Sequence, residues 1–329
     1  MRRRSNRSCT YAVALDSKAG NGEVQELANY LSSLHLAECE VLVLDDCGVA
    51  AFDDRDRILR WVAQHVAVLP HQRFSDGSVD VLQAATELAA TDKLIIASTD
   101  ARYTAADVRS ICELLDRHEV VEPEEYVDPL PWWGGFDAGR ILLHRGVDQT
   151  AHVRSTFALR RTSFRPLRGF DERPVGNCAR RLLMQGAEVH EAHNVFVRRE
   201  PRPFGAWLRE RPREASADLA TPMKSALFLA AVPLLAVLAV IGGTEMAGGY
   251  AGVMAFASIM LAVRGRAGAG KFFPMRACLF APLWICERSL SLYWALFDRL
   301  RIMTSASDVA VGSLKSEGGA RSAKRGLSA

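Results

Sequence analysis

The chain has 329 residues, of which 49% are hydrophobic and 24% are charged, and its formal net charge is +3. This length allows one large domain with residues to spare, and the small net charge gives no indication of a nucleic-acid-binding protein. The seven cysteines form no Cys-x-x-Cys pair and no regular spacing. A disulfide framework and a cysteine zinc site are therefore not expected.

Strands and helices alternate through the first 120 residues, after a basic arm at 1–9. Apolar β-prone runs predict strands at 11–15, 41–44 and 93–97. Helical periodicity predicts helices over 23–34, 53–65, 79–90 and 105–118. This alternation predicts an α/β fold with a mostly parallel sheet flanked by helices.

The strand at 93–97 stops abruptly on polar residues, with a carboxylate at Asp100. Ligands of open α/β sheets gather beyond the carboxyl ends of the strands, so Asp100 is placed to meet a phosphate-bearing ligand and its metal ion. The alternative is that Asp100 only caps the helix that begins near Ala105. A second strand ends on acids at Asp45 and Asp46, which favours the ligand site.

A segment rich in proline and aromatic residues follows at 120–133 and is expected to be irregular. Its paired Trp132 and Trp133 either close a core or stack on a sugar or acceptor ring. The remaining elements expected in this domain are helices at 136–145 and 179–185 and strands at 155–161 and 188–198.

Six groups of residues between positions 10 and 225 occur in a characteristic order. They are Glu40–Asp46 with Cys47; 59–66; Asp100-Ala101-Arg102-Tyr103; 128–132; Leu159-Arg160-Arg161 with Gly169-Phe170-Asp171-Glu172; and 196–201 with 211–215. Together they resemble the family 2 nucleotide-sugar glycosyltransferases, whose fold is of the GT-A type. The resemblance implies a Rossmann-like sheet and transfer of a sugar from a nucleotide diphosphate.

The resemblance also implies roles for single residues. The acid that ends the second strand, Asp46 with its neighbour Asp45, would contact the nucleoside, and Ser98, Asp100 and Arg102 would lie at the donor diphosphate. Asp100 would hold a divalent cation, magnesium or manganese. We expect Trp132, Trp133 and Asp137 on the acceptor side.

Two departures from the family pattern are visible. Relatives carry an Asp-x-Asp motif where this chain has Ser98-Thr99-Asp100, which leaves one carboxylate for a metal ion. The acid expected about a dozen residues before Gly186, the base for the acceptor hydroxyl, is missing from a shortened segment. Asp171 and Glu172 are the candidates to replace it; the alternative is that they are turn and helix-start residues.

Three arginines, Arg209, Arg211 and Arg213, follow at alternate positions. Guanidinium groups match phosphate oxygens in bidentate fashion, so they are candidates to clamp a leaving diphosphate. They fit equally well as a solvated surface near a membrane.

The composition changes from residue 223 onward. Runs at 225–241 and 246–263 carry no charged residue, and each is close to the ~20 residues that cross a bilayer. They predict a membrane hairpin in place of a buried core helix. The basic residues after it, Arg264, Arg266, Lys271 and Arg276, place that end and the enzyme domain in the cytoplasm by the positive-inside rule.

A third apolar stretch at 277–297 contains Glu287 and Arg288, so it is either a third span or an interfacial or re-entrant helix. The tail from 305 to 329 is expected to be disordered. The sequence thus predicts a multi-pass cell-membrane glycosyltransferase with a cytoplasmic catalytic domain. Its expected partners are a nucleotide-sugar donor, the membrane and a lipid-linked or membrane-proximal acceptor. The alternative function is a binding or scaffold subunit that keeps the fold without the activity.

Overall fold

The computed structural model describes residues 8–15, 19–36, 39–45, 47, 49–68, 81–147, 156–163, 188–218, 222–298 and 301. Its elements in chain order are β1 (Cys9–Leu15), α1 (Asn21–Leu36), β2 (Cys39–Asp45), α2 (Val49–Leu59), β3 (Gln64–Ala67), α3 (Val81–Leu88), β4 (Lys93–Ala97), β5 (Ala101–Arg102), α4 (Ala105–Leu115), β6 (Val120–Val127), α5 (Gly134–Val147), β7 (Phe157–Arg160), η2 (Arg161–Ser163), β8 (Val189–Arg199), α7 (Phe204–Asp218), α8 (Pro222–Gly265) and η3 (Met275–Leu279). A last helix follows at 280–298.

The strands form one eight-stranded sheet in the order β3-β2-β1-β4-β7-β6-β8-β5. The first four strands in this order are parallel. Strand β7 is antiparallel to both β4 and β6, and β5 is antiparallel to β8, whereas β6 and β8 run parallel. The α/β class is as expected, but the prediction of a mostly parallel sheet is wrong for the second half, where the sheet is mixed.

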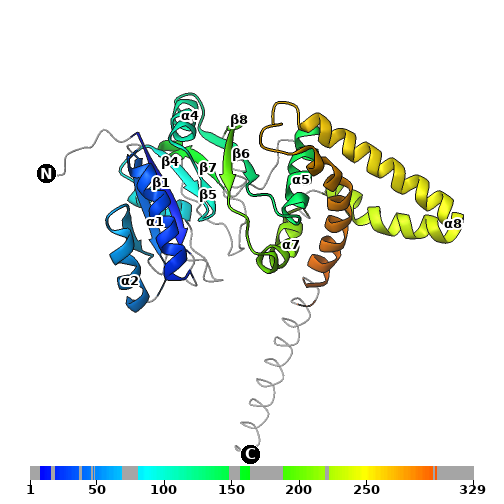
Figure 1. Ribbon diagram of the computed structural model, residues 1–329, viewed down its shortest axis with the longest axis horizontal. Helices are drawn as coiled ribbons and strands as arrows, with labels where there is room; N and C mark the ends of the chain where they lie inside the picture. Colours follow the sequence, from blue (N-terminus) through cyan, green and yellow to red (C-terminus); the bar gives the residue numbers. More distant parts are fainter. Residues whose placement is uncertain are drawn as a thin grey trace, which may run out of the picture.

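The position of α5 explains this difference. A helix that connects two parallel strands packs back onto the sheet that it crosses. Helix α5, which joins β6 to β7, instead packs against the C-terminal helices: Ala138 and Leu142 share a core with Ala262, Phe273 and other residues beyond α7. In Figure 1, α5 stands between the sheet and α8.

Strand β6 corrects the expectation of an irregular segment at 120–133. Its sequence Val-Val-Glu-Pro-Glu-Glu-Tyr-Val looks polar, yet Glu122, Glu124 and Glu125 are all buried. A register shift between Pro123 and Glu124 accommodates the proline in the sheet. Arginines from other elements pair with two of the glutamates: Arg145 with Glu124 at 2.8 Å and Arg199 with Glu125 at 3.2 Å.

The helix predicted over 53–65 is also wrong in its second half. Helix α2 ends at Leu59, and Gln64–Ala67 forms the edge strand β3, paired in parallel with β2. The apolar residue that extended the helical pattern, Trp61, is 75% exposed and packs on no core. An edge strand of four residues, half of them polar, has too little alternation to be found by pattern.

Two apolar cores cover the two faces of the sheet. One contains Tyr11, Val13, Leu31, Val43 and Ile95, and joins α1 and α4 to the sheet. The other contains Leu42, Leu44, Ala84, Leu94 and Ile96, and joins α3 to the opposite face. Because both sides of β1, β2 and β4 are buried, these strands are almost continuously apolar.

Helix α8 is a hairpin of two helical arms. The backbone departs from helical geometry at Gly243, where φ is 68° and ψ is −165°, a left-handed conformation that glycine adopts easily. The hydroxyl of Tyr250 in the second arm donates to the carbonyl of Ala231 in the first, at 3.3 Å. Figure 1 shows the two arms projecting away from the sheet.

Among the described residues, one helical segment, Ser225–Gly265, is long and apolar enough to cross a membrane, and 11% of its apolar window is buried. The helix at 280–298 does not meet that criterion, so a third span is not supported. Its charged Arg288 is buried and faces Glu214 of α7 at 3.5 Å. Tyr293 donates to the carbonyl of Leu229 in α8 at 2.8 Å.

Candidate functional site

Asp100 lies in the turn that follows β4, at the carboxyl edge of the parallel half of the sheet. Its side chain is 14% exposed. The hydroxyl of Ser98 donates to Oδ1, while Arg199 donates to Oδ2 through Nη2 at 2.5 Å and Arg202 through Nε at 3.1 Å. Helix α4 is capped by Thr104, not by Asp100. The capping alternative is therefore wrong.

Asp100 is held in its charged form by these neighbours. Burial raises its pKa, but the guanidinium groups of Arg199 and Arg202 and the hydrogen bond from Ser98 outweigh this effect and lower the pKa to about 2. Asp100 is consequently a carboxylate at every physiological pH.

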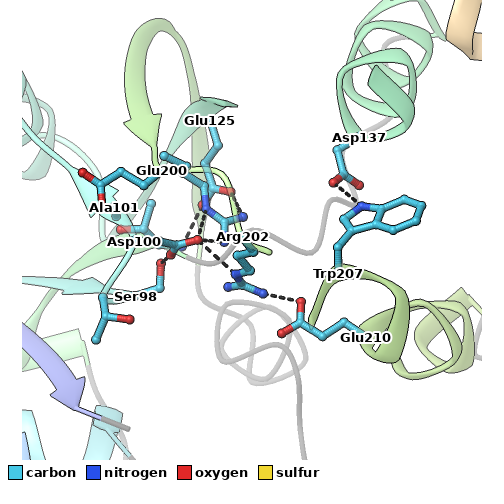
Figure 2. A network of polar contacts seen from close by, with 12 residues as sticks. Ser98, Asp100, Ala101, Glu125, Asp137, Glu200, Arg202, Trp207 and Glu210 are labelled. Atoms are coloured by element: carbon cyan, nitrogen blue, oxygen red, sulfur yellow. Dashed lines mark hydrogen bonds and ion pairs between the residues drawn. The ribbon is translucent and has the colours of Figure 1, made fainter. Parts of the chain in front are cut away.

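Each of the two arginines also reaches a second carboxylate. Nη1 of Arg199 lies 3.2 Å from Glu125 of β6, and Nη1 of Arg202 pairs with Glu210 of α7. Figure 2 shows Arg202 extending from Asp100 to Glu210, so that it joins the edge of the sheet to α7. The guanidinium groups are thus fixed between carboxylates on both sides.

Arg102, on β5, makes a bidentate ion pair with Glu200 at 3.0 and 2.5 Å. Its guanidinium lies 4.8 Å from the centroid of the Tyr30 ring. The hydroxyl of Tyr30 accepts a hydrogen bond from the backbone amide of Tyr103 at 2.7 Å. Arg102 therefore fixes the β5 turn to α1 and to the end of β8, beside the expected donor position.

Asp45, at the end of β2, is fully buried. Arg55 donates to both of its oxygens at 2.9 and 3.1 Å, His65 lies 3.2 Å away, and the amide of Cys47 donates at 2.9 Å. Burial raises the pKa of Asp45, but these partners, His65 first among them, lower it overall. Asp45 is therefore engaged by partners within the chain, and Asp46 lies outside the described residues.

A pocket, partly open to solvent, lies between Asp100 and a second wall formed by α5 and α7. On that wall, Trp207 donates to Asp137 through Nε1 at 2.9 Å, and Arg211 donates to the same carboxylate at 2.9 Å. Burial raises the pKa of Asp137, but Arg211, Arg140 and Trp207 lower it overall. In Figure 2 the pair of Asp137 and Trp207 lies apart from the network around Asp100, which reaches α7 through Glu210.

Arg140 lines the pocket one helical turn after Asp137. Its Nε is buried without a hydrogen-bond partner in the described part of the chain. Arg140 is therefore a cation of this wall that can meet an anionic or hydroxyl-bearing ligand.

The paired tryptophans have different environments. Trp133 lines the pocket, and its Nε1 donates to the backbone carbonyl of Arg202 at 3.2 Å. Trp132 is 62% exposed and packs on Phe204 with 5.3 Å between ring centroids. Trp133 belongs to none of the core clusters of the described residues, and both expected roles of the pair remain predictions.

Of the three candidate diphosphate arginines, the two whose side chains are described, Arg209 and Arg211, have different environments. Arg209 is exposed, and its Nε bonds to the carbonyl of Gly205 in the same helix at 3.1 Å. Arg211 is buried and is engaged by Asp137 and Glu214, both at 2.9 Å. The side chain of Arg213 lies outside the described residues, as do the candidate bases Asp171 and Glu172.

The residues around Asp100 do not fit a divalent cation. Such ions require several oxygen ligands, whereas both oxygens of Asp100 already accept hydrogen bonds and the position two residues earlier is a serine. The described ranges contain no group of three His, Cys, Asp or Glu side chains arranged to hold a metal ion.

Four functional candidates were not found from the sequence: Arg199, Arg202, Glu125 and Glu210. The available signal was the Arg199-Glu200-Pro201-Arg202-Pro203 segment directly after the last strand. Prolines restrict the backbone on each side of Arg202, but the partners of these arginines come from β6 and α7 and cannot be identified by spacing.

No protein-family model matches the chain, and no curated protein matches it in sequence. Among solved structures, it is similar to the mannosyltransferase PcManGT from Pyrobaculum calidifontis in complex with GDP-Man and Mn2+, with a TM-score of 0.49 and 16% identity over 87% of each chain. It is also similar to glucosyl-3-phosphoglycerate synthase from Mycobacterium tuberculosis in complex with Mn2+, UDP and glucosyl-3-phosphoglycerate. There the TM-score is 0.44 and the identity 15%, over 65% of this chain and 79% of that one.

Proposed function

We propose that this protein is a glycosyltransferase that moves a sugar from a nucleotide-diphosphate sugar to an acceptor hydroxyl at a membrane surface. The observation that carries the proposal is the pocket between two charged walls. One wall, with Asp100, Arg199 and Arg202, lies at the carboxyl edge of the parallel strands, where α/β sheets bind phosphorylated ligands. The other, with Asp137 and Arg140, lies on α5, beside the hairpin.

The chemistry follows from this separation. The nucleoside diphosphate occupies the wall at the strand ends, near Asp45, Asp46 and Arg102, and the acceptor occupies the wall of α5 and α7. The acceptor hydroxyl attacks the anomeric carbon, the bond from that carbon to the diphosphate oxygen breaks, and the diphosphate leaves. Fixed guanidinium groups stabilise the charge that develops on the leaving group. Asp171 or Glu172 is the candidate to accept the hydroxyl proton.

The second part of the proposal concerns the membrane. The apolar hairpin projects from the α/β domain, and the exposed basic residues Arg264, Lys271 and Arg276 follow it. Basic residues favour the cytoplasmic side, so the catalytic domain is cytoplasmic. The acceptor is placed beside α5, and α5 packs on this hairpin. The acceptor is therefore lipid-linked or lies close to the membrane.

The test uses the full chain in lipid nanodiscs, incubated with radiolabelled uridine and guanosine diphosphate sugars and with a lipid extract or a water-soluble extract. Transfer of label to the lipid extract with one donor supports the proposal in full. Transfer only to the water-soluble extract retains the enzyme but removes the lipid-linked acceptor.

The rival function is a scaffold subunit that binds a nucleotide sugar without transferring it. The environment of Asp100 favours the scaffold function. In the family pattern this carboxylate holds a metal ion, whereas here it pairs with two arginines. Donor binding without transfer to either extract, and without hydrolysis of the donor, would establish the scaffold.

A further inference from the structure

We infer that Arg199 and Arg202 take the place of a divalent cation at the donor diphosphate, so that this site binds a nucleoside diphosphate without metal. The inference rests on the proposed function, because it concerns the same pocket. It assigns the charge-neutralising role to two arginines to which the sequence analysis gave no role. Its starting observation is the poor fit of the Asp100 surroundings to a metal ion.

Ion pairing within the chain prepares the two arginines for a diphosphate. Ser98 stands in the place of one acid, and the remaining carboxylate, Asp100, is paired with two guanidinium groups. Each guanidinium also pairs with a second carboxylate, Glu125 or Glu210, so the five groups together carry one negative unit. A diphosphate would therefore bind by replacing Asp100 as a partner of the guanidinium groups, since phosphate oxygens match the guanidinium fork as a carboxylate does.

Hydrogen-bonding capacity supports it as well. A guanidinium group has five N–H donors in a planar fork that matches phosphate oxygens. Arg202 uses Nε for Asp100 and Nη1 for Glu210, and it has no further side-chain partner in the described part of the chain. Nη2 is therefore free to donate to a ligand, and the side chain is 35% exposed at the pocket.

The other carboxylates give the arginines a fixed position. Glu125 is buried on β6 and holds Nη1 of Arg199, and Glu210 holds Nη1 of Arg202 from α7. Groups that are already oriented lose little entropy when the ligand binds. The carboxylates also balance the two cations while the pocket holds no anion.

Neighbouring Arg198 provides a matched control. It precedes Arg199 on the same strand, so its side chain points to the opposite face. It is 42% exposed and lies 3.7 Å from Glu200, and it is not among the residues that line the pocket. Arg198→Gln removes one positive charge next to Arg199, from a side chain outside the pocket lining.

The experiment is calorimetric titration of the full chain in detergent with UDP and with GDP, once in EDTA and once in excess Mn2+. Inorganic pyrophosphate in EDTA is then used as a competitor, to isolate the diphosphate contribution. We expect one nucleotide to bind with affinities within threefold of each other in the two conditions, and pyrophosphate to displace it. Arg202→Gln should weaken binding in EDTA about tenfold to a hundredfold, as is typical for loss of a charged hydrogen bond, whereas Arg198→Gln should leave it unchanged.

Asp100→Asn decides between the two kinds of site. If the site holds a metal ion, Asp100→Asn removes a ligand of that ion, so nucleotide binding falls and no longer depends on Mn2+. If the arginines bind the diphosphate, Asp100→Asn removes the carboxylate that competes with it, so nucleotide binding in EDTA is kept or strengthened. Arg199→Gln leaves buried carboxylates unpaired and can unfold the chain, so Arg202→Gln and Asp100→Asn, checked by thermal melting, carry the test.

The outcomes separate the inference from the function on which it rests. Binding that requires Mn2+ and is abolished by Asp100→Asn overturns the inference and leaves a nucleotide-sugar enzyme. Absence of binding of either nucleotide, with and without Mn2+, overturns the proposed function together with the inference.

Discussion

The two halves of the molecule are stabilised in different ways. In the N-terminal half, β1, β2 and β4 are covered on both faces by apolar side chains, most of them fully buried, and a buried ion pair joins Asp45 of β2 to Arg55 of α2. In the C-terminal half, buried charged residues that pair across elements lie on β6, α7 and the helix at 280–298. These residues are Glu124, Glu125, Arg211 and Arg288.

Glycines add a second difference. Helix α5 approaches the hairpin so closely that a Cβ atom on Gly146 would lie 2.0 Å from the carbonyl oxygen of Leu261. A Cβ atom on Gly139 would lie 2.8 Å from the amide nitrogen of Ala281. In α1, by contrast, a Cβ atom on Gly22 would meet nothing within 4 Å. The packing of α5 therefore depends on close backbone contact, whereas the space around Gly22 in α1 admits a side chain.

The largest expected effect is that of Arg211→Met. Arg211 is 3% exposed and pairs with Asp137 and Glu214, so its removal leaves a buried carboxylate uncompensated, at a cost of about 3–5 kcal/mol. Adding Asp137→Asn should recover much of this loss. The measurement is thermal melting of both variants in the same detergent.

The matched change in the other half is Leu42→Ala, which creates a cavity and costs about 2–5 kcal/mol. No single second substitution should rescue it, because it leaves no charge behind. If Asp137→Asn failed to rescue Arg211→Met, the buried pair would not be what distinguishes the C-terminal half.

Next in size is Gly146→Ala. Its Cβ atom would overlap the backbone of α8, which cannot move without shifting the whole arm, so a cost of about 3 kcal/mol is expected. Limited proteolysis should then cut between the α/β domain and the hairpin faster than in the unchanged protein. Unchanged cleavage and unchanged melting would contradict the close packing of α5 on α8.

The third effect depends on pH. The folded protein lowers the pKa of Asp100 from 3.8 to about 2. A lowered carboxyl pKa stabilises the fold fully above the unfolded-state pKa, and this contribution is lost as pH falls from about 4 toward 2. It amounts to about 2 kcal/mol. Thermal melting should therefore show that the unchanged protein melts at a higher temperature than Asp100→Asn above pH 4, and that this difference disappears between pH 4 and pH 2. A difference in melting temperature that is independent of pH would argue against the two arginine pairs.

The smallest effect is expected for Gly22→Ala, in the exposed first turn of α1. The open space around it admits a methyl group, and alanine reduces the entropy of the unfolded chain, so stability should rise by about 0.5–1 kcal/mol. Comparison of Gly22→Ala with Gly146→Ala tests directly whether the two halves differ in how closely their helices pack. If Gly22→Ala lowered the free energy of unfolding by more than about 1 kcal/mol, this difference would not hold.

The sequence by itself determined much of the N-terminal half. The strand predicted at 93–97 is β4, residue for residue, and the runs at 11–15 and 41–44 lie within β1 and β2. These strands are found because burial on both faces requires a continuous apolar run. The abrupt ending of β4 also placed Asp100 at the site edge, and the uncharged runs at 225–241 and 246–263 correspond to the two arms of α8.

Only the tertiary structure decided the rest. Strand β6 looks polar because its glutamates are neutralised by Arg145 and Arg199, which lie on other elements. The pocket wall at the strand ends depends on Arg199 and Arg202 meeting Asp100 from 99 and 102 residues further along the chain. Periodicity records which side of an element is buried, but an ion pair depends on the distance between two side chains. That distance is fixed only when the chain has folded.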